Sequence, residues 1–230
     1  MDYIFTGVWK AFGLIFSLDR EVFNIAILSL WVSSMATVFA SLAGIPVGFV
    51  IGINSFLGKR ALITLFNTLM AFPTVVVGLL LYSVISRQGP LGPLGMLFTP
   101  WAMVMGQFIL ATPIVIALTI SATQGIDPRV RLTALSMGAD TLQTALTILS
   151  ESRFALLSAV IAGFGRVITE VGCALMVGGN IRGYTRTMTT AIALETSKGE
   201  FAFALALGFV LLMVALMVNV FFHWLQGRRG

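Results

Sequence analysis

The sequence is poor in charge, in histidine and in cysteine, and these shortages exclude several classes of protein. Charged residues make up 10% of the 230 residues, whereas hydrophobic residues make up 58%. Soluble domains carry about 25% charged residues, so the composition predicts an integral membrane protein. At about 20 residues per membrane-spanning helix, the chain can hold about five or six helices and no further soluble domain. We expect one all-α transmembrane domain over residues 1–230.

The missing residue types also exclude the usual chemistry of enzymes. One histidine, His223, and one cysteine, Cys173, cannot build a metal site or a Cys–His catalytic pair. The nearest approach to the phosphate-binding loop of an ATPase runs from Gly52 to Arg60, but its glycines are too far apart and arginine replaces the required Ser or Thr. We therefore expect no enzymatic activity, no metal and no cofactor. A separate chain must supply any energy taken from ATP.

Long apolar runs predict five membrane-spanning helices, at about residues 25–53, 61–86, 101–124, 154–178 and 201–225. Phe72-Pro73-Thr74 interrupts the second of them near its centre. Residues 179–199 read as a polar loop. Residues 1–20 are rich in aromatic side chains around Lys10 and too short to span comfortably, which favours an interfacial helix. A sixth, poorly formed span is the alternative for this segment.

Small residues recur at every fourth position of the first predicted helix, namely Ala36, Ala40, Gly44, Gly48 and Gly52. One face of this helix is therefore nearly free of side chains. Another helix can approach it closely, and we interpret the stripe as plain helix packing.

The longest polar interruption is DPRVRLTALSMGADTLQTALTILSE, residues 127–151. Asp127 can cap a helix that starts at Pro128, because proline has no amide hydrogen to lose there. Gly138 can adopt the left-handed conformation that ends this helix, and Asp140 with the glutamine three residues later has the form of a capping box. We predict two short helices joined by a glycine elbow.

This pattern resembles the cytoplasmic coupling loop of ABC-importer permeases, in which Glu-Ala-Ala, three residues, glycine and nine residues precede Ile-x-Leu-Pro. The spacing matches at Ala134, Gly138 and Ile148, but the glutamate and the Leu-Pro are missing. In that family the loop docks into a separate ATPase subunit. The resemblance therefore implies an ATPase-coupling role for Ala134, Gly138, Ala139, Asp140 and Ile148.

Two ionisable residues, Arg166 and Glu170, fall inside the predicted helix 154–178. A charge at bilayer depth costs about 2.5–3.5 kcal/mol, so both side chains should face protein or water, and they can neutralise each other at this spacing. Three roles remain open: a structural or interface lock, the lining of a substrate path, or a proton relay in a secondary transporter. A membrane-embedded hydrolase is the weakest interpretation, because Glu170 has no second acid nearby in sequence.

Residues 163–207 resemble the permease subunits of tungstate ABC importers, and the likeness extends from about residue 18 to the C-terminus. Residues 66–78, FNTLMAFPTVVVG, are similar to the same family. The run from Glu170 to Asn180 is shared in form with molybdate permeases, whereas TTAIALET, residues 189–196, points to the tungstate branch. The resemblance implies a MetI-like type-I permease fold with five core helices.

The resemblance also implies partners: a second copy of the chain, a cytoplasmic ATPase dimer and an extracytoplasmic tungstate-binding protein, in a prokaryotic inner membrane. Molybdate or sulfate is the alternative substrate. Arginines suit the attraction of a tetrahedral dianion, so Arg182 and Arg186 join Arg166 and Glu170 as candidates for a translocation path or gate. The alternative is that Arg182 and Arg186 are solvated loop charges.

Charge bias does not set the orientation in the membrane. With residues 127–151 inside, seven basic residues fall inside and six outside, a margin too small for the positive-inside rule. The resemblance alone places this loop in the cytoplasm. The net charge of +5 is scattered over the loops, so we expect no nucleic-acid partner.

Overall fold

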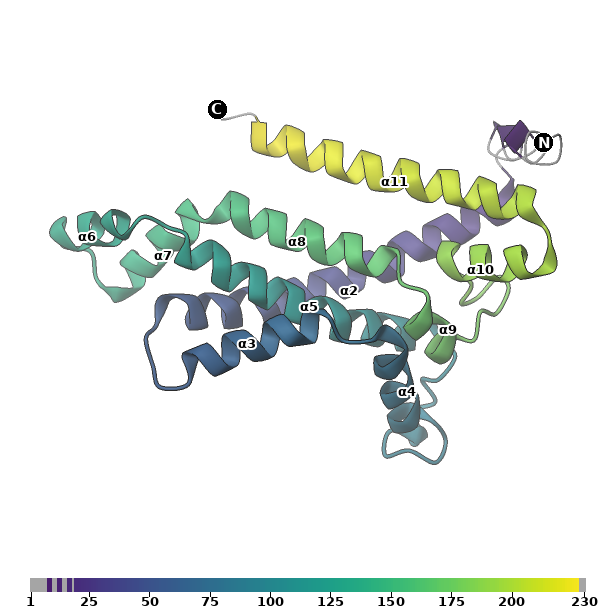
Figure 1. The fold of residues 1–230 in the computed structure, drawn as a ribbon, viewed down its shortest axis with the longest axis horizontal. Helices are drawn as coiled ribbons and strands as arrows, with labels where there is room; N and C mark the ends of the chain where they lie inside the picture. Colours follow the sequence, from purple (N-terminus) through teal and green to yellow (C-terminus); the bar gives the residue numbers. More distant parts are fainter. Residues whose placement is uncertain (1–7, 10–11, 14–15, 18, 228–230) are drawn as a thin grey trace.

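The computed structural model describes residues 8–9, 12–13, 16–17 and 19–227. Most of the segment expected to form an interfacial helix lies outside these residues. Within the described residues the regular structure consists of helices (Figure 1). Four long ones run beside one another: α2 (Arg20–Ile53), α5 (Pro100–Gln124), α8 (Arg153–Ile168) and α11 (Phe201–Gly227).

The first two long helices begin where their sequences provide caps. The Asp19 carboxylate accepts hydrogen bonds from the backbone N–H groups of Glu21 and Val22, at 2.9 and 3.1 Å. The Thr99 hydroxyl accepts one from Ala102 at 3.3 Å, with Pro100 in the first turn. These side chains satisfy amides that have no partner inside a helix.

The small-residue stripe of α2 packs against α5, as predicted. A Cβ atom added to Gly48 would lie 2.7 Å from both the Ile116 carbonyl oxygen and the Thr119 Cβ atom. One added to Gly52 would lie 2.8 Å from the Thr123 Cβ atom. Glycine is therefore required at these positions for the two backbones to reach their observed separation.

The predicted span at 61–86 is sharply broken. It forms α3 (Lys59–Met70) and α4 (Thr74–Ile85), which meet at 95°. Pro73 lies in extended conformation between the two helices, with a φ angle of −63° and a ψ angle of 120°. In Figure 1, α3 lies along the bundle and α4 turns away from it.

The expectation of one continuous helix over 154–178 is wrong. Helix α8 ends at Ile168, and the short helix α9 (Gly172–Gly178) follows after a break. Local side-chain hydrogen bonds contribute to the break: the Thr169 hydroxyl donates to the Gly165 and Arg166 carbonyls, both at 3.1 Å, and the Glu170 carboxylate caps α9. Side chains thus replace helical hydrogen bonds here.

Both breaks lie at the same place. A Cβ atom added to Gly172, the first residue of α9, would lie 2.7 Å from Val75 Cγ2 and 3.1 Å from Thr74 Oγ1, at the start of α4. A Cβ atom added to Gly78 of α4 would lie 2.9 Å from the Cys173 Cα atom. Helices α4 and α9 therefore pack as one unit at an angle to the main bundle (Figure 1).

The expectation of a polar loop over 179–199 is also wrong, because this segment contains helix α10 (Met188–Lys198). The hydroxyl of Thr190 accepts from the Thr187 backbone N–H at 3.0 Å in a reciprocal capping box, and Gly199, with a φ angle of +84°, ends the helix. The first amide of α10, on Met188, donates to the Ser29 hydroxyl of α2 at 2.7 Å. This contact ties α10 to the bundle.

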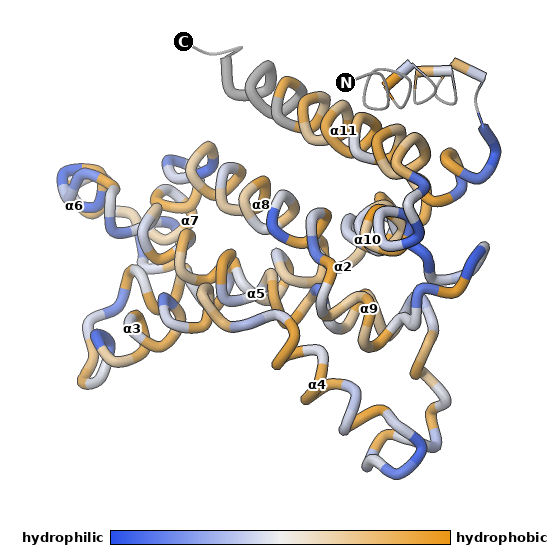
Figure 2. The backbone as a smooth tube through the Cα atoms, turned by 45° about the vertical axis from the view of Figure 1, so that its right-hand side comes forward, coloured by the Kyte–Doolittle hydropathy of each residue, from blue (hydrophilic) through white to orange (hydrophobic). Residues whose placement is uncertain are grey.

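The remaining helices are α6 (Pro128–Ser136), α7 (Thr141–Glu151) and the 3-10 turn η1 (Gly92–Leu94). By length and composition, α2, α5 and α11 can each cross a membrane. Two bent pairs, α3 with α4 and α7 with α8, bring the possible number of spans among the described residues to five. Hydropathy follows this division, since polar residues gather at α6 and at the ends of the long helices (Figure 2).

Candidate functional site

The segment 127–151 folds into the two helices and elbow predicted from its sequence. The Asp127 carboxylate caps α6 by accepting from Arg129 N–H at 2.9 Å. At the other end of α6, the amides of Gly138 and Ala139 donate to the Leu135 and Ala134 carbonyls at 3.0 and 3.1 Å. Gly138 has a φ angle of +83°, so this is the glycine-dependent stop known as a Schellman motif.

Helix α7 follows directly and has its own cap. The Asp140 carboxylate accepts from Gln143 N–H at 2.7 Å, and the Gln143 side chain accepts from Asp140 N–H at 3.0 Å. Ala134 and Ile148 are buried, at 9% and 8% exposure. The spacing that carries the resemblance thus corresponds to two buried residues and the turn between them.

The elbow exposes large apolar side chains, which the sequence reasoning missed. They are Leu132, Leu135, Met137, Leu142 and Leu146, with exposures between 47% and 83%. Polar residues separate them along α6, α7 and the turn between these helices. Exposed apolar patches rimmed by polar residues mark interaction sites, so α6 and α7 are a candidate docking surface. Apolar residues scattered through the polar sequence 127–151 were the signal for it.

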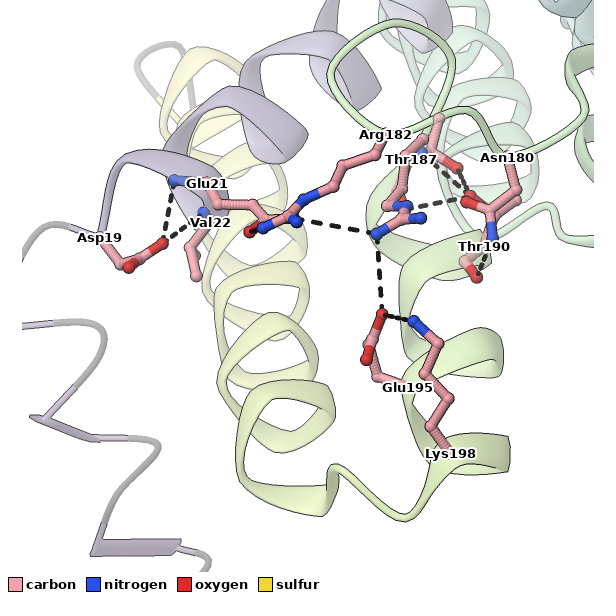
Figure 3. A network of polar contacts seen from close by, with 10 residues as sticks. Asp19, Glu21, Val22, Asn180, Arg182, Thr187, Thr190, Glu195 and Lys198 are labelled. Atoms are coloured by element: carbon pink, nitrogen blue, oxygen red, sulfur yellow. Dashed lines mark hydrogen bonds and ion pairs between the residues drawn. The ribbon is translucent and has the colours of Figure 1, made fainter.

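A network of ion pairs lies at the opposite end of the bundle (Figure 3). Arg182 makes a bidentate pair with the Glu21 carboxylate, with Nε 2.7 Å from Oε1. The hydrogen bond and negative charge of Glu21 raise the pKa of Arg182. The pair joins the loop after α9 to the first turn of α2.

Arg186 lies deeper in the same network than Arg182, with 11% of its side chain exposed against 71%. Its Nη1 atom is 3.8 Å from Glu21 Oε1 and 3.6 Å from Glu195 Oε1, and its Nε atom is buried without a hydrogen-bond partner among the described residues. Lys198 also pairs with Glu195, at 3.0 Å. A cavity of about 390 Å³ borders Arg20, Glu21, Arg182 and Arg186.

Arg166 and Glu170 lie between these two ends, at the break that separates α8 from α9. Arg166 Nη1 donates to Glu170 Oε2 at 3.2 Å. The other oxygen, Oε1, accepts from Cys173 N–H at 3.0 Å, and the Glu170 carbonyl accepts from the Thr189 hydroxyl at 2.7 Å. Glu170 therefore joins α8, α9 and α10, and only 3% of it is exposed.

The sequence-predicted residues thus occupy three separate places. Ala134, Gly138, Ala139, Asp140 and Ile148 lie at the α6–α7 elbow, Arg166 and Glu170 at the break, and Arg182 and Arg186 in the network at the far end. No group of three or more His, Cys, Asp or Glu residues in the described part of the chain could hold a metal ion.

Among the described residues, the helical bundle with broken membrane helices and an exposed helical elbow fits a membrane transport permease. The chain belongs to the family of binding-protein-dependent transport system inner membrane components, whose model matches residues 44–230. It is therefore an inner-membrane protein of ABC importers and has the type-I permease fold.

Individual relatives agree with this family over nearly the whole chain. The tungstate uptake system permease protein of Campylobacter jejuni is 46% identical over 226 residues, which cover 98% of this chain and 95% of the relative. That of Peptoclostridium acidaminophilum is 39% identical, with 98% and 99% covered. Among solved structures, an inward-facing conformation of the MetNI methionine ABC transporter has a TM-score of 0.69 at 14% identity, over 93% of this chain and 96% of that one.

The Glu170 contacts generate a prediction about stability. Arg166→Met leaves a buried carboxylate without its cationic partner, so we expect a loss of about 1–3 kcal/mol in stability. The double variant Arg166→Met with Glu170→Gln removes the charge but keeps an oxygen for Cys173 N–H, and it should recover most of the loss. Thermal unfolding in detergent of the parent, both single variants and the double variant measures this. Additive losses across the four proteins would show that Arg166 and Glu170 act through separate partners.

Proposed function

We propose that this chain is the membrane subunit of an ATP-driven importer of tungstate. The observation that carries the proposal is the 46% identity, over 98% of the chain, to a permease of tungstate uptake. The second tungstate permease, 39% identical over a similar length, supports the same substrate. Molybdate and sulfate are the alternative oxyanions, since all three are tetrahedral dianions of similar hydrogen-bonding chemistry.

The proposed complex contains two copies of this chain, two ATPase subunits and an external binding protein. The α6–α7 elbow supports the ATPase contact, because its exposed leucines and Met137 would be buried by docking. This contact places the elbow in the cytoplasm and the Glu21–Arg182 pair on the outer side. The permease itself makes no covalent change to the substrate, and the partner subunit hydrolyses ATP.

The broken helices support a translocation role. A helix interrupted at membrane depth is tolerated where its free backbone groups face protein or a water-filled cavity. Here two interruptions, at Pro73 and at Glu170, meet each other through Gly172. Within the proposal, Glu170 and Arg166 hold this junction together, so that α4 and α9 can move as a unit beside the path.

Arg182 and Arg186 are proposed to attract the anion at the outer end. In the network, Arg182, Arg186 and Lys198 carry three positive charges against two on Glu21 and Glu195. Arg20 adds a further positive charge beside the cavity of about 390 Å³, so the surface there is net positive. A positive entrance raises the local concentration of an anionic substrate. In this proposal the external binding protein, and not the permease, binds the anion tightly.

Substitutions of Arg182 and Arg186 should therefore separate the attraction of the anion from the stability of the permease. We expect Arg182→Met to lower the tungstate uptake rate a few-fold without loss of assembly, because this side chain is 71% exposed. Arg186→Met should lower both uptake and thermal stability, since its guanidinium is largely buried between Glu21 and Glu195. Arg87→Met, at an exposed arginine outside the network, is the control. Unchanged uptake by both network variants would leave these arginines a structural role alone.

The coupling role of the elbow is tested by a bulky residue at Gly138. With a φ angle of +83° and no heavy atom within 4 Å of an added Cβ atom, Gly138→Arg strains the turn by about 1 kcal/mol and projects into the docking surface. We expect normal membrane insertion and loss of ATP-dependent transport. Gly199→Arg is the matched control, because Gly199 has a φ angle of +84° and lies at the opposite end. Substrate-stimulated ATP hydrolysis at the parent rate with Gly138→Arg would refute the coupling assignment.

Substrate identity is tested by competition. Cells that express this permease with its ATPase and binding protein should accumulate labelled tungstate, and unlabelled tungstate should compete better than molybdate or sulfate. The matched control is the same strain without the permease. Uptake insensitive to tungstate but blocked by molybdate or sulfate would keep the importer and overturn its substrate.

A further inference from the structure

Helix α3 carries a polar stripe that nothing in the described part of the chain covers. The stripe consists of Arg60, Thr64, Asn67 and Thr68, all exposed, at spacings that place them on one side of a helix. A different side, with Ile63 and Phe66, packs against the cluster of Ile51, Ile116 and Ile120. Leu65, which is 49% exposed, lies at the other edge of this exposed face, about 160° around the helix from Asn67 but only about 60° from Thr68.

The stripe cannot face lipid. Helix α3 with α4 forms one of the bent pairs that are long and apolar enough to cross a membrane, and we infer that the half of α3 nearest α4, which contains Asn67, lies at membrane depth. Polar groups at that depth face protein or water, because hydrocarbon offers them no hydrogen bonds. Leu65 suits contact with lipid, whereas the side with Asn67 requires a polar occupant.

The positive charge of the stripe favours an anion as the polar group that lies against it. Helix α3, KRALITLFNTLM, contains no acidic residue. The guanidinium of Arg60 makes no ion pair within the described residues, and it lies at the end of α3 that is nearest the elbow. Positive charge at the mouth of a polar surface favours anionic over cationic solutes.

The hydrogen-bond inventory then singles out Asn67. The hydroxyls of Thr64 and Thr68 donate their protons to the Arg60 and Thr64 carbonyls, both at 2.9 Å, so these threonines offer acceptors to the stripe. The Asn67 amide group carries two N–H donors, which an oxyanion needs and a cation does not. Asn67 lies about 10 Å along the helix from Arg60, seven residues at 1.5 Å each.

We propose that Asn67 is a transient ligand of the oxyanion inside the translocation path, and that the polar stripe of α3 lines the part of this path nearest the elbow. The inference rests on the proposed function, to which it adds a substrate-contacting residue. A neutral amide suits this position, because it can replace part of the hydration of a dianion without holding it as a buried arginine would. In this proposal Arg60 attracts the oxyanion to the end of the stripe, and Asn67 binds the oxyanion weakly within the stripe.

Transport by the complete complex tests the contact. Asn67→Asp should lower the tungstate uptake rate about tenfold, because a carboxylate replaces the donors and repels a dianion. Asn67→Leu should lower it several-fold, while ATP hydrolysis stimulated by the loaded binding protein persists in both. Ser83→Ala, on α4 and outside the stripe, is the control, since this exposed hydroxyl likewise donates its proton to a backbone carbonyl, that of Leu80 at 2.7 Å, and its rate should stay within about twofold of the parent.

Water access is tested independently of transport. In reconstituted complexes, Asn67→Cys should react with an anionic, membrane-impermeant thiol reagent, and tungstate should slow the reaction. Leu65→Cys should stay unreactive on the lipid side, and the parent serves as the blank because its single cysteine, Cys173, is 1% exposed.

The outcomes separate this inference from the proposed function. Parent-level uptake by Asn67→Leu and Asn67→Asp, or equal reactivity of Leu65→Cys and Asn67→Cys, overturns the role of Asn67 while the importer stands. Absence of tungstate uptake by the parent overturns the proposed substrate instead. In that case labelling of Asn67→Cys, slowed by molybdate or sulfate, would still support an anion path along α3.

Discussion

Close approach of helix backbones to α5 is the constraint on which the rest of the structure depends. Glycines provide this approach from several directions. Gly44, Gly48 and Gly52 of α2 would place added Cβ atoms within 3.0 Å of α5 atoms. Gly163 of α8 would place one 3.1 Å from Val115 Cγ2. Lipid provides no hydrophobic drive between helices, so close van der Waals contact must hold such a bundle together.

Close packing at glycines also holds the unit formed by α4 and α9 against α5. Within α5, a Cβ atom at Gly106 would lie 2.5 Å from the Cys173 sulfur, and one at Gly178 of α9 would lie 2.7 Å from the Met103 sulfur. Sulfur side chains thus fill the spaces that glycine leaves. A central helix with small residues therefore carries α2 and α8 along its length and α9 at one end. This arrangement leaves the elbow and the ion-pair network at opposite ends of the bundle.

The sequence predicted local structure best where backbone chemistry decides it. The caps at Asp127 and Asp140 and the positive φ angle of Gly138 depend on residues within three or four positions, so they could be predicted from the sequence. The stripe from Ala36 to Gly52 was likewise interpretable, because only side-chain size matters there.

The sequence predicted least where distant contacts decide. Apolar residues on both sides of Glu170 favour one continuous helix, but the carboxylate caps α9 and the Glu170 carbonyl accepts from Thr189, 19 residues away. Helix α10 has local signals in Thr187, Thr190 and Gly199 that the sequence analysis overlooked, whereas its attachment to Ser29 of α2 could not be predicted from nearby residues. The ion pair of Glu21 with Arg182 joins residues 161 positions apart, and no local pattern indicates it. The resemblance to a permease family compensated for this by supplying the overall architecture.

The source of the driving energy is the central claim, because it separates an ABC importer from a secondary transporter that would use Arg166 and Glu170 as a proton relay. The direct measurement is tungstate accumulation in proteoliposomes that contain this chain, its ATPase and the binding protein. ATP on the ATPase side should drive accumulation, and a proton gradient without ATP should not. Accumulation driven by the proton gradient in vesicles that contain this chain alone would contradict the account.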